Sequence, residues 1–190
     1  MITGHFGLAT GVKKFAPRLP LWSLLLASFW LDVIFIVFSM FGLESFAPMN
    51  PANPAYGEVI INAYYTHSLV GAILISLLTG WIASLRWKKD SGLVIGAVVF
   101  SHWILDLLIH RPDLPLLPGN LGNLPLLGLG LWQYPRLSGA IELVLAIGGV
   151  VLYWVGAPKS KREQRRRALT ASLVTGALLL LLFISNIFGV

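Results

Sequence analysis

Five long apolar stretches constrain what this chain can fold into. They cover Leu19–Leu43, Ala63–Leu85, Leu93–Ile109, Leu137–Val155 and Ala168–Val190. A helix needs ~20 apolar residues to cross the ~30 Å of hydrocarbon in a bilayer, and most of these stretches approach that length. Hydrophobic residues fill 56% of the 190 positions and charged residues only 12%, which is too apolar for a soluble domain. The sequence predicts an all-α fold, a polytopic helical bundle in which residues 1–190 form one integral membrane domain with about five transmembrane helices.

Basic residues mark alternate connections between these stretches. Of the 14 Lys and Arg residues, 12 precede the first stretch or join the second to the third and the fourth to the fifth; only Arg111 and Arg136 lie in the other two loops. The positive-inside rule places the basic connections in the cytoplasm and residues 44–62 and 111–136 outside. The 12 residues are Lys13, Lys14, Arg18, Arg86, Lys88, Lys89, Lys159, Lys161, Arg162, Arg165, Arg166 and Arg167.

The net charge of +6 is therefore mostly a topology signal. The cluster from Lys159 to Arg167 is expected to contact anionic lipid headgroups, so membrane lipids are expected partners. No basic soluble domain is available to hold nucleic acid, which is excluded as a partner. The first apolar stretch is too long for a signal-peptide core and is expected to stay in the mature protein.

A polar stripe interrupts the third stretch. His102, Asp106 and His110 stand at every fourth position of an otherwise apolar run. Successive members of such a series are rotated by only ~40° on a helix, so the three side chains share one face. The absence of cysteine excludes thiolate ligands and leaves imidazole and carboxylate as the metal ligands on offer. The stripe predicts a metal site.

Other ionisable residues have a similar predicted depth. Counted at 1.5 Å per residue from the basic ends of their stretches, Asp32 and His102 lie ~20 Å, Glu142 ~24 Å and His67 ~28 Å into the membrane. A charged residue at the centre of a transmembrane helix costs ~2.5 kcal/mol or more. The coincidence of these groups in the outer half of the bilayer predicts mutual pairing or a shared cation.

The remaining segments are expected to differ from the five stretches. Ile2–Phe15 is too short to cross and predicts a half-helix that enters from the cytoplasmic face, with His5 ~12 Å deep, below the other candidates. Residues 44–62 indicate an irregular outer loop with solvated Glu44 and Glu58. Residues 111–136, rich in Pro, Gly and Leu, are expected to lie in the interface or cover a cavity, with Asp113 solvated.

Four short motifs together resemble a known family. Gly4–Phe6 (GHF), Asp32, Thr66–Ser68 (THS) and Ser101–Asp106 (SHWILD) occur in the order found in the YdjM-like inner-membrane metal-dependent hydrolases. The chain departs from the family pattern where DxDH is reduced to Asp32 and where residues 62–65 replace HRG. The resemblance implies a multi-pass protein of a bacterial inner membrane and adds His5 to the metal ligands. The SHxxxD element, followed by His110, also faintly resembles zinc-dependent phospholipases C, which favours phosphoester chemistry.

The expected metal ligands are His67, His102 and Asp106, joined by His110 or Asp32. A divalent ion bound there would lower the pKa of a bound water toward ~7. Zinc is favoured because imidazole is a ligand of borderline softness.

The remaining site residues are assigned to catalysis. Glu142 is expected to act as general base or to orient a ligand, Asp32 to serve as a catalytic carboxylate, and Arg111 to face an anionic substrate group. The sequence thus predicts a metal-dependent hydrolase, open to the extracytoplasmic side, with an amphiphilic or phosphorylated small-molecule substrate.

Two non-enzymatic functions stay open. A transporter or proton relay would also place Asp and His inside the membrane, although five stretches do not divide into an inverted repeat. In a structural membrane protein, the polar groups would only fasten helices together. Among enzymes, the absence of HExxH and GxSxG argues against zinc proteases of that type and serine hydrolases, and four histidines are too few for a membrane di-iron desaturase.

The orientation can be tested with single cysteines, because the natural chain has none. We expect Leu121→Cys to react with a membrane-impermeant thiol reagent in intact cells and Lys161→Cys to react only after lysis. Labelling at position 161 but not at position 121 in intact cells would refute the orientation.

Overall fold

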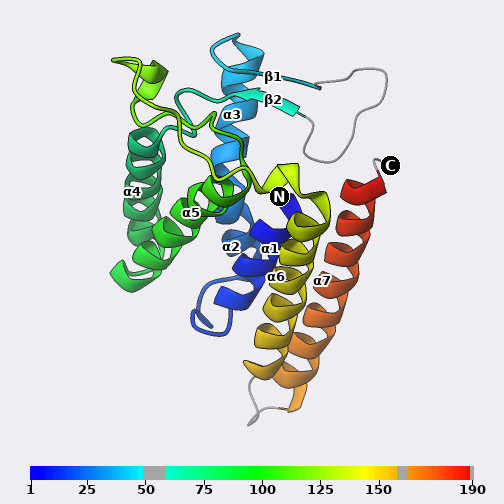
Figure 1. Cartoon of the computed structure of the whole chain (residues 1–190). Helices are drawn as coiled ribbons and strands as arrows, with labels where there is room; N and C mark the ends of the chain where they lie inside the picture. The colour runs from blue at the N-terminus through cyan, green and yellow to red at the C-terminus, as the bar shows by residue number, and fades with distance from the viewer. Residues whose placement is uncertain (49–58, 158–161, 189–190) are drawn as a thin grey trace.

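Seven helices dominate the computed structural model, which describes residues 1–48, 59–157 and 162–188; Glu58, Lys159 and Lys161 lie outside these ranges. Four helices are long and apolar enough to cross a membrane, and a bent pair of shorter helices gives a fifth span if the two cross as one. The predicted multi-pass helical fold is thereby confirmed (Figure 1). The spans are α4 (Leu69–Arg86), α5 (Lys89–Ile109), α6 (Pro135–Val155), α7 (Arg162–Phe188) and the pair α2 (Leu21–Ser28) with α3 (Trp30–Met40).

The first predicted span is broken rather than continuous. Helix α2 ends at Ser28, α3 begins at Trp30, and the two axes differ by 51°. Phe29 leaves the helical region with φ −112° and ψ 8°. The Ser28 hydroxyl donates to the Leu25 carbonyl at 2.9 Å, and such bonds from a hydroxyl to the preceding turn favour helix bending. The break frees backbone groups in the middle of the bundle.

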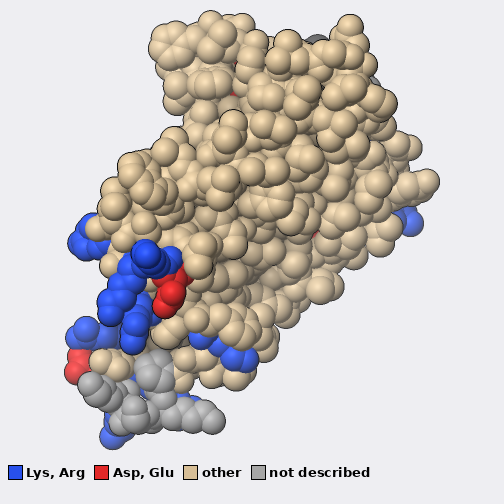
Figure 2. Space-filling model, turned by 90° about the vertical axis from the view of Figure 1, so that its left-hand side faces the viewer, with Lys and Arg blue, Asp and Glu red and all other residues tan. Residues whose placement is uncertain are grey.

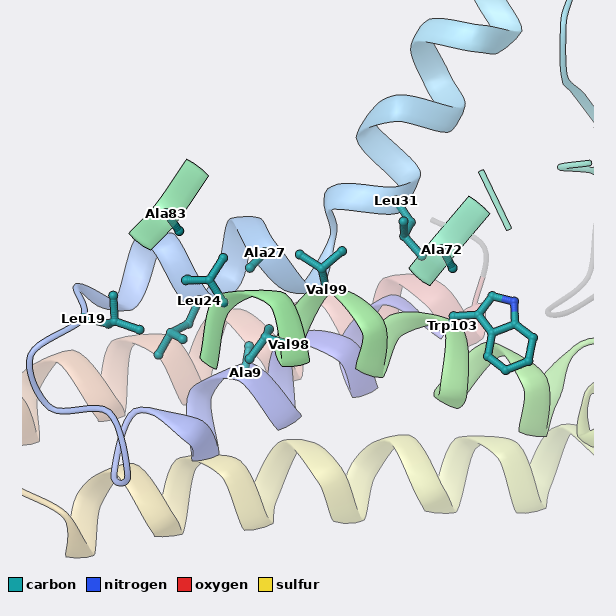
Figure 3. Packing of buried hydrophobic residues seen from close by; sticks show 11 residues of the cluster. Ala9, Leu19, Leu24, Ala27, Leu31, Ala72, Ala83, Val98, Val99 and Trp103 are labelled. Atoms are coloured by element: carbon teal, nitrogen blue, oxygen red, sulfur yellow. The ribbon is translucent and has the colours of Figure 1, made fainter. Parts of the chain in front are cut away.

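Helix α5 forms the centre of the bundle. Half of its membrane-spanning window is buried, against 11–33% for the other three long spans. It packs against α4 and α2, and also touches α3 and α1 (Ile2–Val12). Figure 3 shows the apolar side chains where these helices meet, with Val98 of α5 next to Ala9 of α1. The central position explains why α5 can carry a polar stripe that never faces lipid.

The predicted N-terminal half-helix is present as α1. It has 11 residues and runs beside α6 in the same direction, since Gly4 lies against Leu145, Gly7 against Ala146 and Gly11 against Gly149. A Cβ on Gly149 would lie 1.9 Å from the Gly7 carbonyl oxygen. Glycine thus permits the backbones of α1 and α6 to touch, as small residues do between membrane helices.

The segment after α3 is more regular than predicted. It contains the antiparallel strands β1 (Ser45–Pro48) and β2 (Val59–Asn62), so the expectation of a wholly irregular loop is wrong. Its apolar run Val59–Ile61 supplies the β-branched residues that favour strands. Phe46 packs on Phe35 with ring centroids 5.9 Å apart, which places the hairpin beside α3 (Figure 1).

Residues 111–136 fold onto the helix ends. They contain two short 3-10 helices, Pro118–Asn120 and Leu131–Gln133. The carbonyls of Pro115 and Leu116 accept the amides of Leu69 and Val70, at 2.9 and 3.2 Å. These amides start α4 and have no partner within their own helix. The segment therefore covers the beginning of α4, and its predicted place in the interface or over a cavity stays a prediction.

The described basic connections share one end of the molecule. Gly156, after α6, lies against Lys14, and a small pocket brings residues 15–19 next to Lys88. Figure 2 shows Lys and Arg in the lower half of one face, whereas the upper half is covered almost entirely by uncharged residues. The arrangement agrees with alternating connections, and the side on which the cytoplasm lies stays a prediction.

Two neighbouring glycines offer a matched test of the α1–α6 contact. Gly149→Ala would force the α1 and α6 backbones apart, whereas Gly148→Ala adds a methyl group with nothing within 4 Å. We expect Gly149→Ala to lower the stability by about 1–3 kcal/mol, as overpacking does, and Gly148→Ala to leave it unchanged or raise it slightly. Thermal unfolding of the purified protein in detergent measures both; equal Tm values for the two variants would contradict the packing.

Candidate metal centre

Four side chains from separate parts of the chain meet inside the bundle. Asp32 comes from α3, His67 from the turn before α4, and His102 and Asp106 from successive turns of α5. The two histidine Nε2 atoms are 3.3 Å apart. The Asp32 Oδ1 atom lies 3.4 and 3.5 Å from them, and the Asp106 Oδ2 atom 3.5 and 3.1 Å. Each of the two carboxylates thus has an oxygen within 3.5 Å of both imidazole nitrogens.

Three of these side chains are spaced for one ion, because the ligand atoms of Asp32, His67 and His102 all lie within 4.8 Å of one another. Zinc holds nitrogen and oxygen ligands at about 2.0–2.2 Å, so the edges of its coordination tetrahedron are about 3.3–3.6 Å long. The three edges among Asp32, His67 and His102 measure 3.3–3.5 Å. The donor set also fits, because nitrogen and oxygen donors without thiolate are compatible with zinc and other divalent metals. This group could therefore hold a metal ion.

The broken span fixes the ring of His102. Its Nδ1 atom lies 2.7 Å from the Ser28 carbonyl oxygen at the end of α2. A carbonyl can only accept a hydrogen bond, so Nδ1 carries a proton, and in the neutral ring Nε2 presents a lone pair to the centre. A straight helix would direct the Ser28 carbonyl to the amide of residue 32. The break at Phe29 thus creates the acceptor that orients this ring.

His67 is oriented by a chain of two residues that the sequence did not reveal. The Thr66 hydroxyl donates to Glu44 Oε2 at 2.8 Å and lies 2.8 Å from His67 Nδ1. Because the hydroxyl proton is given to the carboxylate, the hydroxyl accepts from Nδ1–H, and Nε2 again faces the centre as a lone pair. Glu44 also accepts the amides of Tyr65 and Thr66. The expectation of a solvated Glu44 is wrong, because Glu44 is only 3% exposed.

The two ring orientations have an electrostatic consequence. With both Nδ1 atoms protonated, the Nε2 lone pairs of His67 and His102 face each other and the two carboxylate oxygens. These acceptors repel unless a cation or added protons lie among them. A divalent ion would remove the repulsion, and so would protons shared between imidazole and carboxylate, as in a cluster that only joins helices.

His110 lies at the edge of the group. Helix α5 ends at Ile109, and His110 is extended with φ −61° and ψ 149°, so the helix does not continue through His110 and Arg111. Pro112 explains the end, because the residue before a proline avoids helical conformations. His110 Nδ1 donates to Asp113 at 2.9 Å, while its Nε2 lies 3.9 Å from Asp106. Asp113 is thus paired rather than simply solvated.

His5 reaches the centre from α1. Its ring stacks on His102 with centroids 3.9 Å apart, and its Nε2 lies 3.1 Å from Asp106 Oδ1. The expectation that it lies below the other candidates is wrong, because α5 is strongly inclined (Figure 1) and gains less depth per residue than a perpendicular helix. His5, His102 and Asp106 form a second group with ligand atoms within 4.8 Å of one another.

Glu142 and Arg111 lie outside the two metal groups found among the described residues. Glu142 is fully buried on α6, and its Oε2 accepts the Gly4 amide at 3.3 Å. A carboxylate at the first turn of α1 stabilises the positive end of that helix and holds it one residue from His5. Arg111 follows the end of α5 and is half-buried. The catalytic roles assigned to both residues stay predictions.

Access to the centre differs among its members. The side chains of His5, His67, His102, Asp106 and His110 are at most 5% exposed, whereas that of Asp32 is 26% exposed. A small molecule would therefore approach past Asp32 rather than along α5.

Comparisons with known proteins give no match: no family model fits the chain, and no curated protein and no solved structure is significantly similar to it. The resemblance to YdjM-like hydrolases thus depends on the four short motifs alone. The structure brings the polar members of all four, namely His5, Asp32, His67, His102 and Asp106, into one buried cluster.

Thr66 offers a test of the hydrogen-bond chain to His67. We expect Thr66→Val to weaken zinc binding about 10- to 100-fold, the usual loss when a partner that orients a ligand is removed, and Thr66→Ser to bind nearly as the natural protein does. Metal analysis after dialysis against graded zinc buffers measures both, with His102→Ala as the variant expected to lose the ion. Equal affinity of the Val and Ser variants would show that Thr66 does not orient the ligand.

Proposed function

We propose that this protein is a zinc-dependent hydrolase embedded in the membrane, which cleaves a lipid-like or phosphoester substrate. One observation carries the proposal: the ligand atoms of Asp32, His67 and His102 lie 3.3–3.5 Å apart, which suits three ligands of tetrahedral zinc, and a second such group of His5, His102 and Asp106 adjoins it. Bound zinc would supply a water of lowered pKa and would polarise a substrate oxygen.

The chain's own residues would divide the remaining work. His67 and His102 would be held as neutral ligands by Thr66 and by the Ser28 carbonyl. Asp32, the most exposed member, would border the path by which the substrate enters. An oxygen of Asp32 not engaged with the ion could also accept a proton there, which would be the catalytic role expected from the sequence.

Two residues outside the metal groups are also assigned roles: Glu142 in positioning or proton transfer, and Arg111 in attracting the substrate. Glu142 would hold α1 and thereby place His5, and a carboxylate so close to the cluster is also a candidate general base. Arg111, next to His110 at the outer end of α5, would attract an anionic group such as a phosphoester. Both assignments can be separated by variants that keep the metal.

The substrate class follows from the surroundings of the centre. The ligands lie within or beside helices that are apolar enough to cross a membrane, so an amphiphilic molecule can reach this depth more readily than a strongly hydrated one. The SHxxxD element, similar to that of zinc-dependent phospholipases C, supports phosphoester chemistry. We therefore place an amphiphilic phosphoester ahead of peptides and sugars.

A transporter remains the second candidate, because intramembrane Asp and His residues also line ion paths. The burial of every ligand except Asp32 favours the hydrolase, since a transport path needs access from two sides. Ion flux without turnover would favour the transporter.

The proposal predicts zinc-dependent turnover. Purified protein stripped of metal and reconstituted in lipid nanodiscs should hydrolyse lipid phosphoesters only after zinc is added, and faster than it hydrolyses short soluble analogues. Asp106→Asn should lose both metal and activity. Glu142→Gln should retain the metal and, if Glu142 is the general base, lose about 10²- to 10⁴-fold in rate. Zinc binding without turnover of any phosphoester, together with ion flux into vesicles, would overturn the hydrolase function.

A further inference from the structure

An apolar groove runs between α4 and α5, two helices that lie on the side of the bundle opposite α7 (Figure 1). Its volume is about 550 Å³, within the ~300–1,000 Å³ of ordinary ligand sites. The metal ligands take no part in its lining. The residues that shape it include Leu77, Trp81, Leu93, Ala97, Phe100 and Lys89.

The floor of the groove is closed by a direct backbone contact. A Cβ on Gly80 would lie 2.9 Å from the Gly92 carbonyl oxygen, and a Cβ on Gly96 3.0 Å from that of Ser76. The small residues of α4 and α5 are therefore already used in packing these two helices together. Another helix could not use them for the close backbone approach that drives association in membranes.

The walls are apolar and turned outward. Leu77, Trp81 and Leu93 are 61–74% exposed, and they belong to helices long enough to cross the membrane. At this depth the surrounding solvent is hydrocarbon, so an alkyl chain would lie against these walls without losing favourable contacts.

One charged residue lines the groove, and it lies at one end. Lys89 is the first residue of α5, and Arg86 and Lys88 flank it in the connection from α4. The acidic Asp90 next to it lines a different pocket, shared with residues 15–19. An amphiphile with an anionic headgroup and an alkyl chain matches this pattern of charge at the mouth and apolar walls along the length.

We propose that the groove binds one acyl chain of an anionic phospholipid from the leaflet next to the basic connections, with the lipid phosphate at Lys89. The site is separate from the metal centre and does not depend on the hydrolase function. A zwitterionic lipid carries the same phosphate together with a cationic group that Lys89, Arg86 and Lys88 would repel, so it would bind more weakly. The closed floor argues against a helix from a second copy.

Native mass spectrometry of the purified full-length protein in detergent tests the headgroup contact. With phosphatidylglycerol and phosphatidylcholine of identical chains as probes, we expect one tightly bound phosphatidylglycerol and weaker phosphatidylcholine. Lys89→Gln should weaken phosphatidylglycerol binding about five-fold, the effect of one Lys at an anionic surface. Lys88→Gln, which removes the same charge outside the groove, should change it less. Equal effects of the two variants, or equal affinity for both lipids, would overturn the proposed contact.

A second pair of variants tests the chain-binding groove. Ala97→Trp should fill the groove and reduce phosphatidylglycerol binding, whereas Leu78→Trp, on an exposed part of α4 outside the lining, should not. Glycerol phosphate, which lacks chains, should not compete with the lipid. Competition by glycerol phosphate, unchanged binding to Ala97→Trp, or a dimer whose cross-links fall on Leu77 and Leu93 would each refute the acyl-chain site.

Discussion

A buried cluster of two imidazoles and two carboxylates is the constraint on which this structure depends. Each of His67 and His102 has its Nδ1 atom committed to an acceptor, so only its Nε2 atom remains to face the carboxylates of Asp32 and Asp106. Such a cluster is unfavourable in hydrocarbon unless positive charge occupies it. The protein therefore has to enclose the cluster and to hold positive charge within it, as protons or as a metal ion.

The irregular features of the fold serve this enclosure. The break between α2 and α3 provides the Ser28 carbonyl for His102, and the close glycine contact with α6 carries His5 of α1 to Asp106. The start of the hairpin contributes Glu44, which holds Thr66 and through it His67. Each of these irregular segments supplies a polar group to the cluster, whereas the backbone groups of a continuous helix are bonded within the helix.

Sequence patterns predicted the helical spans and most residues of the buried cluster, because both depend partly on local periodicity. Apolar length marks a span, and the four-residue spacing of His102 and Asp106 places them on one helix face. The partners of the ligands could not be predicted in the same way. Glu44 is 22 residues from Thr66, with which it pairs, and nothing in its neighbourhood distinguishes it from a solvated loop residue.

The sequence predicted which residues form the buried cluster better than it predicted how deep each of them lies. A count of residues converts to depth only for a helix perpendicular to the membrane, whereas α5 is inclined (Figure 1) and His5 therefore lies level with His102 instead of below it. The break at Phe29 also could not be predicted from a Gly or Pro, because none stands next to it. The nearest local signal is Ser28, whose hydroxyl hydrogen-bonds to a backbone carbonyl of the preceding turn.

The residues of the cluster come from different elements of the fold, so a bound ion would join those elements to one another. Asp32, His67 and His102 come from α3, from the turn before α4 and from α5, and α3 and α5 have few other contacts with each other. A cation shared by these elements would add an attraction that their apolar faces, which gain little from contact inside lipid, do not provide. Metal affinity would then contribute directly to the stability of this arrangement, and the orienting partners Thr66, Glu44 and the Ser28 carbonyl would act on stability and on chemistry through the same two imidazole rings.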